Sequence, residues 1–206
     1  MIRISLFAVA ILGAAFAWNL TSAADAEKKE AAVPQVGDAA PEVTLMTDTG
    51  DEWKSADHYG KKIVVLYFYP ADMTGGCTKQ ACGFRDSLAD LTDAGVEVVG
   101  VSGDSVKNHQ LFKKAHKLNF TLLADPMGAA AEAFGVPFTP GEKSVTATID
   151  GKEEILVRTV TTQRWTIVVG LDGKIAMKRD LKAEGTEAGN DPAVVRAFIE
   201  KLKTGA

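Results

Sequence analysis

An unbroken apolar run, Ile63–Tyr69 within the stretch KIVVLYFY, is the sequence feature that most restricts the fold. A run without alternating polar residues is typical of a β-strand that is covered on both faces. The next segment, residues 78–95, carries apolar residues at helical intervals and ends in glycine. Its apolar positions are Ala81, Phe84, Leu88 and Leu91. The chain therefore follows a buried strand with an amphipathic helix that can cover it.

The same alternation continues through the middle of the chain. Residues 96–102 and 120–125 predict two more buried strands, and residues 105–118 and 128–135 predict two more helices. Strands that alternate with helices form a parallel sheet with right-handed crossovers. We therefore expect an α/β fold.

The last third of the chain has a different pattern. Residues 143–160 and 164–180 each contain an Asp-Gly turn between strand-like segments, which predicts two antiparallel hairpins. Residues 191–203 predict a closing helix, with Asp191 as its N-cap and Pro192 in its first turn. Adding antiparallel strands to a parallel core gives a central mixed sheet flanked by helices.

Residues 1–26 have the layout of a secretory signal peptide, and the alternative is an uncleaved anchor. Arg3 precedes an apolar run, Ile4–Ala17, which is shorter than the roughly 20 residues that span a bilayer. The candidate cleavage sites follow Ala17, Ala24 and Ala26. We expect an exported protein, periplasmic or secreted, with no stable membrane insertion after cleavage. Residues 27–35 read as a linker, and residues 36–206 as one domain.

Composition excludes several classes of function. The net charge of −4 and the absence of a basic stripe exclude a nucleic-acid partner. Two cysteines are too few for a disulfide scaffold, and no Cys/His set has zinc spacing, so we expect no metal and no cofactor. The three histidines, His58, His109 and His116, do not converge in sequence with carboxylates or cysteines. His109 and His116 are seven residues apart on one predicted helix, which indicates a polar face.

Cys77 lies where the first buried strand gives way to its helix, just after a predicted Gly75-Gly76 turn. Free backbone N–H groups and the helix dipole favour a thiolate in the first turn of a helix. The Thr74 hydroxyl could hydrogen-bond the sulfur or a bound oxygen, and Pro70 could cover one side of the pocket. A shielded thiolate of this kind attacks oxygen or sulfur electrophiles.

Cys82, the other cysteine, is five residues further along the same predicted helix. Five helical steps separate Cα atoms by about 8.7 Å, from a rise of ~1.5 Å and a rotation of ~100° per residue. A disulfide tolerates at most about 7 Å between Cα atoms. The two cysteines could therefore bond only if the first turn unwinds. The alternative is a pair of structural thiols or a static disulfide in a loop.

The stretch FYPADMTGGCTKQACGFRD resembles the active site of peroxiredoxins, in their bacterioferritin-comigratory or Q-type branch. That branch has a Pro-x-x-x-Thr-x-x-Cys motif and a second cysteine five residues later, which Pro70, Thr74, Cys77 and Cys82 match. The resemblance extends over about 36–178. It implies a thioredoxin-like fold in which Cys77 is the peroxidatic cysteine. Such an enzyme reduces hydrogen peroxide or organic hydroperoxides to water or alcohol.

The resemblance also implies the rest of the catalytic cycle. Cys82 would be the resolving cysteine and would form an intramolecular disulfide with Cys77, which a thioredoxin-like protein would reduce. The family's active-site arginine precedes a late strand, and Arg164 is the best match. Arg85 and Arg158 compete for that role. Because this mode of resolution needs no partner subunit, we expect a monomer.

The sequence departs from the family pattern in three places. Gly75-Gly76 replaces Pro-Gly, Trp165 replaces a small hydroxyl residue, and residues 140–162 form a longer insertion with a predicted hairpin. This insertion could cover the pocket, tune substrate size or form a contact surface. Two other functions remain open: an exported thiol-disulfide oxidoreductase, which normally carries Cys-x-x-Cys, and a non-catalytic thioredoxin-fold interaction module.

Overall fold

The computed structural model describes residues 32–205, and residues 33–206 form one compact unit. The predicted signal peptide lies outside the described residues, as does the linker up to residue 31. No helix within residues 32–205 is long and apolar enough to cross a membrane.

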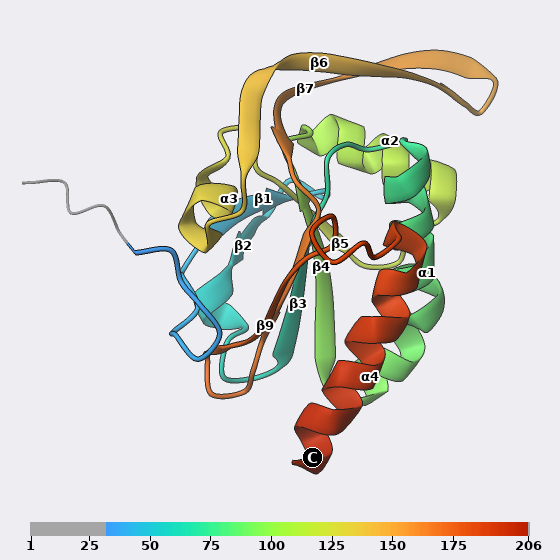
Figure 1. Cartoon of the computed structure of the whole chain (residues 1–206). Helices are drawn as coiled ribbons and strands as arrows, with labels where there is room; N and C mark the ends of the chain where they lie inside the picture. The colour runs from blue at the N-terminus through green and yellow to red at the C-terminus, as the bar shows by residue number, and fades with distance from the viewer. Residues whose placement is uncertain (1–31, 206) are drawn as a thin grey trace, which may run out of the picture. The chain divides into compact units, whose positions relative to one another are not determined.

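A seven-stranded mixed sheet forms the centre of this unit, in the strand order β2-β1-β5-β4-β3-β8-β9 (Figure 1). Its strands are β1 (Thr44–Thr47), β2 (Glu52–Lys54), β3 (Ile63–Phe68), β4 (Val96–Ser102), β5 (Thr121–Ala124), β8 (Trp165–Val169) and β9 (Ile175–Asp180). The three strands predicted from the alternating pattern, β3, β4 and β5, are parallel neighbours. The other pairings are antiparallel, so the predicted mixed sheet is confirmed.

Helices cover both faces of the sheet. They are α1 (Gly75–Asp93), α2 (Val106–His116), α3 (Ala129–Phe134) and α4 (Asp191–Thr204), with short 3₁₀ helices at Ser55–Asp57 and Ala188–Asn190. Every residue of β3 is buried, and its side chains alternate between two hydrophobic clusters. Tyr67 belongs to the cluster that contains Phe84 of α1 and Ile199 of α4, while Phe68 belongs to the one that contains Phe134 of α3. Burial on both faces explains the unbroken apolar run.

The predicted hairpin insertion is present as a separate two-stranded sheet, β6 (Phe138–Ile149) and β7 (Lys152–Thr162). Figure 1 shows it as a long arm that passes above α2. Its turn has positive φ angles at Asp150 (50°) and Gly151 (77°), as a two-residue Asp-Gly hairpin turn requires. The arm begins two residues before the predicted boundary at residue 140.

The structure corrects three local predictions. Gly75 and Gly76 belong to the first turn of α1 and do not form a separate turn before it. Asp191 is not the N-cap of α4, because Asn190 holds that position and the Asp191 side chain bonds to other elements. The short strands β1 and β2 were missed, since four and three residues are too few to show a periodic pattern.

Candidate active site

Cys77 is held at the start of α1 by the strand that precedes it. Strand β3 ends at Phe68, a five-residue loop (70–74) follows Tyr69, and α1 begins at Gly75. Cys77 is therefore the third residue of the helix, where backbone N–H groups have no intrahelical acceptor and the helix dipole is positive. Only 1% of Cys77 is exposed. The sulfur therefore lies where it can interact with fixed positive groups but hardly with water.

Arg164 supplies such a group. Its Nη2 lies 3.0 Å from the Cys77 sulfur, although the two residues are 87 positions apart. The sheet explains the contact: β8 pairs antiparallel with β3, with Trp165 opposite Phe68. Arg164 precedes β8 and therefore lies beside the loop that follows β3. The structure thus brings together the predicted thiol and the predicted arginine.

Gln80 connects Arg164 to a second buried group that the sequence reasoning missed. The Gln80 Oε1 accepts a hydrogen bond from Arg164 Nη1, and its Nε2 donates to Asp191 Oδ2 at 2.8 Å. Asp191, which is fully buried, also accepts from Thr166 Oγ1 (2.7 Å) and from Arg179 Nη1 (2.8 Å). We call Arg164, Gln80, Asp191, Thr166 and Arg179 the arginine cluster. Gln80 lies three residues after Cys77, on the same face of the helix, and that spacing was the available signal.

The loop between β3 and α1 carries the other two predicted site residues. The single hydroxyl proton of Thr74 is donated to the Ala71 carbonyl oxygen at 3.1 Å, rather than to the Cys77 sulfur. Pro70 is half-buried at the end of β3. Met73, next to Thr74, has a φ angle of 61°, in the left-handed region that non-glycine residues seldom adopt. The Thr74 side chain therefore bonds within the loop and not to Cys77 in this structure.

A second buried polar cluster holds this loop in place. Asp72 Oδ2 lies 2.8 Å from His109 Nδ1, Asp72 Oδ1 accepts from the Tyr69 hydroxyl at 2.7 Å, and the Asp72 N–H donates to Asp104 Oδ2 at 2.9 Å. Asn108 Nδ2 donates to Asp104 Oδ1 at 3.0 Å. We call Tyr69, Asp72, Asp104, Asn108 and His109 the loop cluster. The prediction that His109 lies on a polar face was wrong, because Asn108 and His109 are the buried residues in the first turn of α2. His58 also meets a carboxylate, since its Nδ1 lies 2.8 Å from Glu97 Oε2.

Burial shapes the charges of the loop cluster. Burial raises the pKa of Asp104, and the negative charge of Asp72 raises it further. For His109, burial by itself lowers the pKa, but the neighbouring carboxylates, Asp72 foremost and then Asp104, raise it, so that the pKa lies above the ordinary value of 6.5. The His109 Nε2 has no hydrogen-bond partner within residues 32–205. The loop cluster is therefore a buried, charged group that supports the active-site loop.

Cys82 and the two competing arginines lie apart from the Cys77–Arg164 contact. Cys82 is half-buried in the same helix, and both cysteines are free thiols. Arg85 pairs with Asp86 (2.7 Å) and donates to the His116 carbonyl oxygen. Arg158 donates to Thr161 at 2.9 Å. Among the described residues, Arg164 is the arginine that contacts the Cys77 sulfur.

Comparisons with known proteins place the chain in one family. The AhpC/TSA family model matches residues 36–178. Peroxiredoxin bcp of Coxiella burnetii, so named provisionally, is 54% identical over 102 residues, which cover 50% of this chain and 67% of that relative. Peroxiredoxin Q of the chloroplast of Oryza sativa subsp. japonica is 50% identical over 101 residues, covering 49% of this chain. The match spans about half, 46%, of the length of that plant protein.

A solved structure gives the same result for the fold. The bacterioferritin comigratory protein of Xanthomonas campestris, studied for its alkyl peroxide reduction activity, superposes with a TM-score of 0.63 at 25% identity. The superposition covers 82% of this chain and 98% of that one. The central mixed sheet with flanking helices is thus the thioredoxin-like fold of peroxiredoxins. The chain therefore belongs to the AhpC/TSA family, as a peroxiredoxin of the bacterioferritin-comigratory or Q type.

Proposed function

We propose that this enzyme reduces hydrogen peroxide and organic hydroperoxides with Cys77 as the attacking group. The Cys77 thiolate attacks one peroxide oxygen, so that an S–O bond forms as the O–O bond breaks. The sulfur becomes a sulfenic acid, and the departing hydroxide or alkoxide takes a proton to leave as water or alcohol. The alkyl peroxide reduction activity of the Xanthomonas campestris protein supports organic hydroperoxides as a substrate class.

The contact between Arg164 and Cys77 is the observation that carries this proposal. At 3.0 Å, the guanidinium stabilises the thiolate, and its remaining N–H groups can polarise a peroxide oxygen beside the sulfur. Because Cys77 is almost fully buried, this charge interaction is weakly screened by water. A static structural cysteine has no need of a half-buried arginine against its sulfur.

Cys82 resolves the sulfenic acid in the proposed cycle. Its thiol attacks the Cys77 sulfur, a disulfide forms, and the sulfenic oxygen leaves as water. Both cysteines lie within α1, where helical spacing keeps their Cα atoms about 8.7 Å apart, so resolution requires the start of α1 to unwind. A thioredoxin-like dithiol protein then reduces the disulfide and is itself oxidised.

The cellular setting of the cycle is part of the same proposal. The signal-like residues 1–26 support an exported enzyme, which a cytosolic thioredoxin could not reach. The reductant is then a periplasmic or membrane-fed thiol protein, and the enzyme works as a monomer because both cysteines are in one chain. Labelling intact cells that produce the enzyme with a membrane-impermeant thiol reagent tests export. An intracellular enzyme would not react with the reagent.

The test of the reaction is stopped-flow mixing of the reduced protein with hydrogen peroxide and with an organic hydroperoxide. Wild type should be oxidised rapidly and stoichiometrically, Cys77→Ser should not react, and Cys82→Ser should accumulate a sulfenic acid that dimedone traps. A thiol-disulfide oxidoreductase would instead react with disulfide substrates and only sluggishly with peroxide. Slow reaction with both substrates would identify a non-catalytic interaction module.

A further inference from the structure

Asp191 is a buried carboxylate at the start of α4 that the proposed reaction does not use. It is 0% exposed, and its three side-chain partners come from α1, β8 and β9. One of these partners, Gln80, also binds Arg164, which contacts the Cys77 sulfur. Only one side chain therefore stands between Asp191 and the arginine of the proposed site.

The hydrogen-bonding capacities of the three groups fix the orientation of the Gln80 amide. Arg164 can only donate, and an ionised carboxylate can only accept. Gln80 satisfies both neighbours in one orientation alone, with Oε1 towards Arg164 and Nε2 towards Asp191. If the amide were turned over, two donors would meet at Arg164 and two acceptors would meet at Asp191. An ionised Asp191 therefore fixes the amide in the orientation in which Gln80 Oε1 accepts the hydrogen bond from Arg164.

The groups around Asp191 stabilise the negative charge of a carboxylate that is buried away from water. The Arg179 guanidinium pairs with Oδ1 at 2.8 Å, while Thr166 and Gln80 donate to Oδ2. Burial raises the pKa of Asp191, and the hydrogen bonds from Thr166 and Gln80 and the charge of Arg179 oppose that rise. Each oxygen of the carboxylate has at least one donor, as a buried charge requires.

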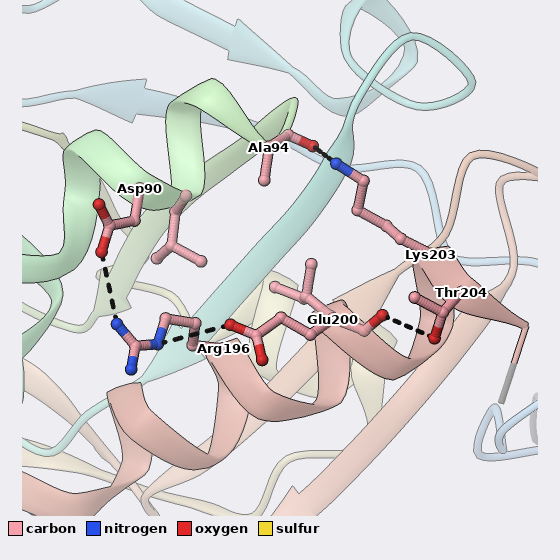
Figure 2. Close-up of a pocket in the computed structure, with 8 residues that line it drawn as sticks. Asp90, Ala94, Arg196, Glu200, Lys203 and Thr204 are labelled. Atoms are coloured by element: carbon pink, nitrogen blue, oxygen red, sulfur yellow. Dashed lines mark hydrogen bonds and ion pairs between the residues drawn. The ribbon is translucent and has the colours of Figure 1, made fainter.

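The attachment of α4 to α1 fixes the position of Asp191 relative to Gln80. At Gly83 of α1, a Cβ atom would lie 2.8 Å from Pro192 Cγ, so the glycine permits the close approach of the two helices. Towards the other end of α4, Arg196 reaches Asp90 (3.4 Å) and Lys203 donates to the Ala94 carbonyl oxygen (2.9 Å) across a pocket of about 380 Å³ (Figure 2). Contacts at both ends hold α4 against α1.

We propose that Asp191 is a positioning residue: by orienting the Gln80 amide, it holds the Arg164 guanidinium against the Cys77 sulfur. This inference rests on the proposed function for its catalytic consequence. Its structural claim, that Asp191 controls the state of the Cys77 thiol, can be measured without any peroxide. Asp191 touches no reacting atom and acts only through Gln80 and Arg164.

The test uses full-length protein in a Cys82→Ser background and has two readouts. One is the pH midpoint of Cys77 alkylation by iodoacetamide, and the other is the rate of single-turnover oxidation by hydrogen peroxide. In Asp191→Asn, the introduced amide can donate or accept, so Gln80 is free to turn over and Arg164 loses its acceptor. We expect the alkylation midpoint to move to higher pH and the peroxide rate to fall about tenfold.

A double variant in which the amide and the carboxylate change places distinguishes a positioning role from a general disturbance of the structure. Adding Gln80→Glu to Asp191→Asn gives Arg164 a carboxylate acceptor, to which the introduced amide can donate. The double variant should recover both readouts, with a peroxide rate within about threefold of wild type. The matched control is Asp125→Asn, since Asp125 is another buried carboxylate (1% exposed) but accepts from backbone N–H groups of α3. It should leave both readouts unchanged.

The outcomes separate this inference from the proposed function. Wild-type values for both readouts in Asp191→Asn, or a double variant no better than the single one, would overturn the inference. If Asp191→Asn does not fold, the double variant decides: wild-type-like behaviour supports the inference, and a tenfold loss overturns it. A wild-type protein inert to peroxide, combined with a shifted alkylation midpoint in Asp191→Asn, would reject the proposed function and leave the positioning role standing.

Discussion

The arginine cluster and the loop cluster both lie beside Cys77, but only the first touches its sulfur. Arg164 reaches the sulfur at 3.0 Å, and its partners fix the direction of its guanidinium. Asp72 and His109, in contrast, form a buried pair at 2.8 Å. The Asp72 carboxylate also accepts from the Tyr69 hydroxyl, and the Asp72 backbone N–H donates to Asp104. The difference teaches that buried charge has two separate uses here. In the proposed reaction, one cluster sets the chemistry of the thiol, and the other supports the loop that presents it.

The largest expected effect comes from removing the charge that touches the thiol. Arg164→Gln should lower the rate of Cys77 oxidation by hydrogen peroxide by about 10²- to 10³-fold, because a preorganised donor to the reacting atoms is lost. The rate is measured in single turnover. The control is Arg85→Gln, which removes a half-buried arginine that bonds to Asp86 and to the His116 carbonyl oxygen and should react at the wild-type rate. Equal losses in the two variants would contradict a special role for Arg164.

Breaking the loop cluster should instead affect stability first. Asp72→Asn leaves His109 without its charged partner in a site where both side chains are fully buried, which costs about 3–5 kcal/mol of unfolding free energy. Urea denaturation measures this loss, and the peroxide rate of the folded fraction should fall less than in Arg164→Gln. If Asp72→Asn had normal stability and its rate fell as far as that of Arg164→Gln, the two clusters would not have separate roles.

The pH dependence of stability should also report on the loop cluster. The pKa of folded His109 lies above its ordinary value of 6.5, so the folded protein keeps this proton to higher pH than the unfolded chain. The stabilisation is fully present below pH 6.5 and is lost as the pH rises through the folded-state pKa. The difference in unfolding free energy between wild type and His109→Gln should shrink as the pH rises above about 6.5. A difference that grows with pH would show the opposite shift.

The smallest effect concerns the glycine that opens α1. Gly75 is the first residue of the helix, a Cβ there meets no atom within 4 Å, and Thr74 has the extended backbone that suits a following proline. Gly75→Pro should therefore stabilise the protein by about 0.4–1 kcal/mol and slow formation of the Cys77–Cys82 disulfide, with little change in the first oxidation. The disulfide is followed by quenched-flow alkylation. Faster disulfide formation would show that the first turn does not need to unwind.

Much of the fold could be predicted from the sequence because it depends on local pattern. The β3–α1 pair, the three parallel strands and the Asp150-Gly151 turn each have a signal within a few residues. β1 and β2 have none, since each is too short to show a period. The order of the sheet was not predicted either, because the placement of β8 beside β3 depends on contacts about 100 residues apart in the chain.

The candidate site divides in the same way. Cys77 was identified from its position at a strand–helix junction, and Arg164 from the family resemblance. Gln80 and Asp191 were missed as partners because their hydrogen bond spans 111 residues, and no local pattern records it. His109 was assigned to a polar face because a helical period gives the spacing of a face but not its direction. Long-range side-chain pairing is therefore the part of the site that local sequence patterns could not supply.

The most direct test of the account is peptide-level mass spectrometry of the reduced Cys82→Ser protein after one equivalent of hydrogen peroxide, with dimedone present. We expect dimedone to modify Cys77 almost completely, and the addition of Arg164→Gln to reduce this labelling strongly at the same reaction time. Unmodified Cys77 in the otherwise wild-type site, or labelling that does not depend on Arg164, would contradict the claim that the arginine-bound sulfur is the group that attacks peroxide.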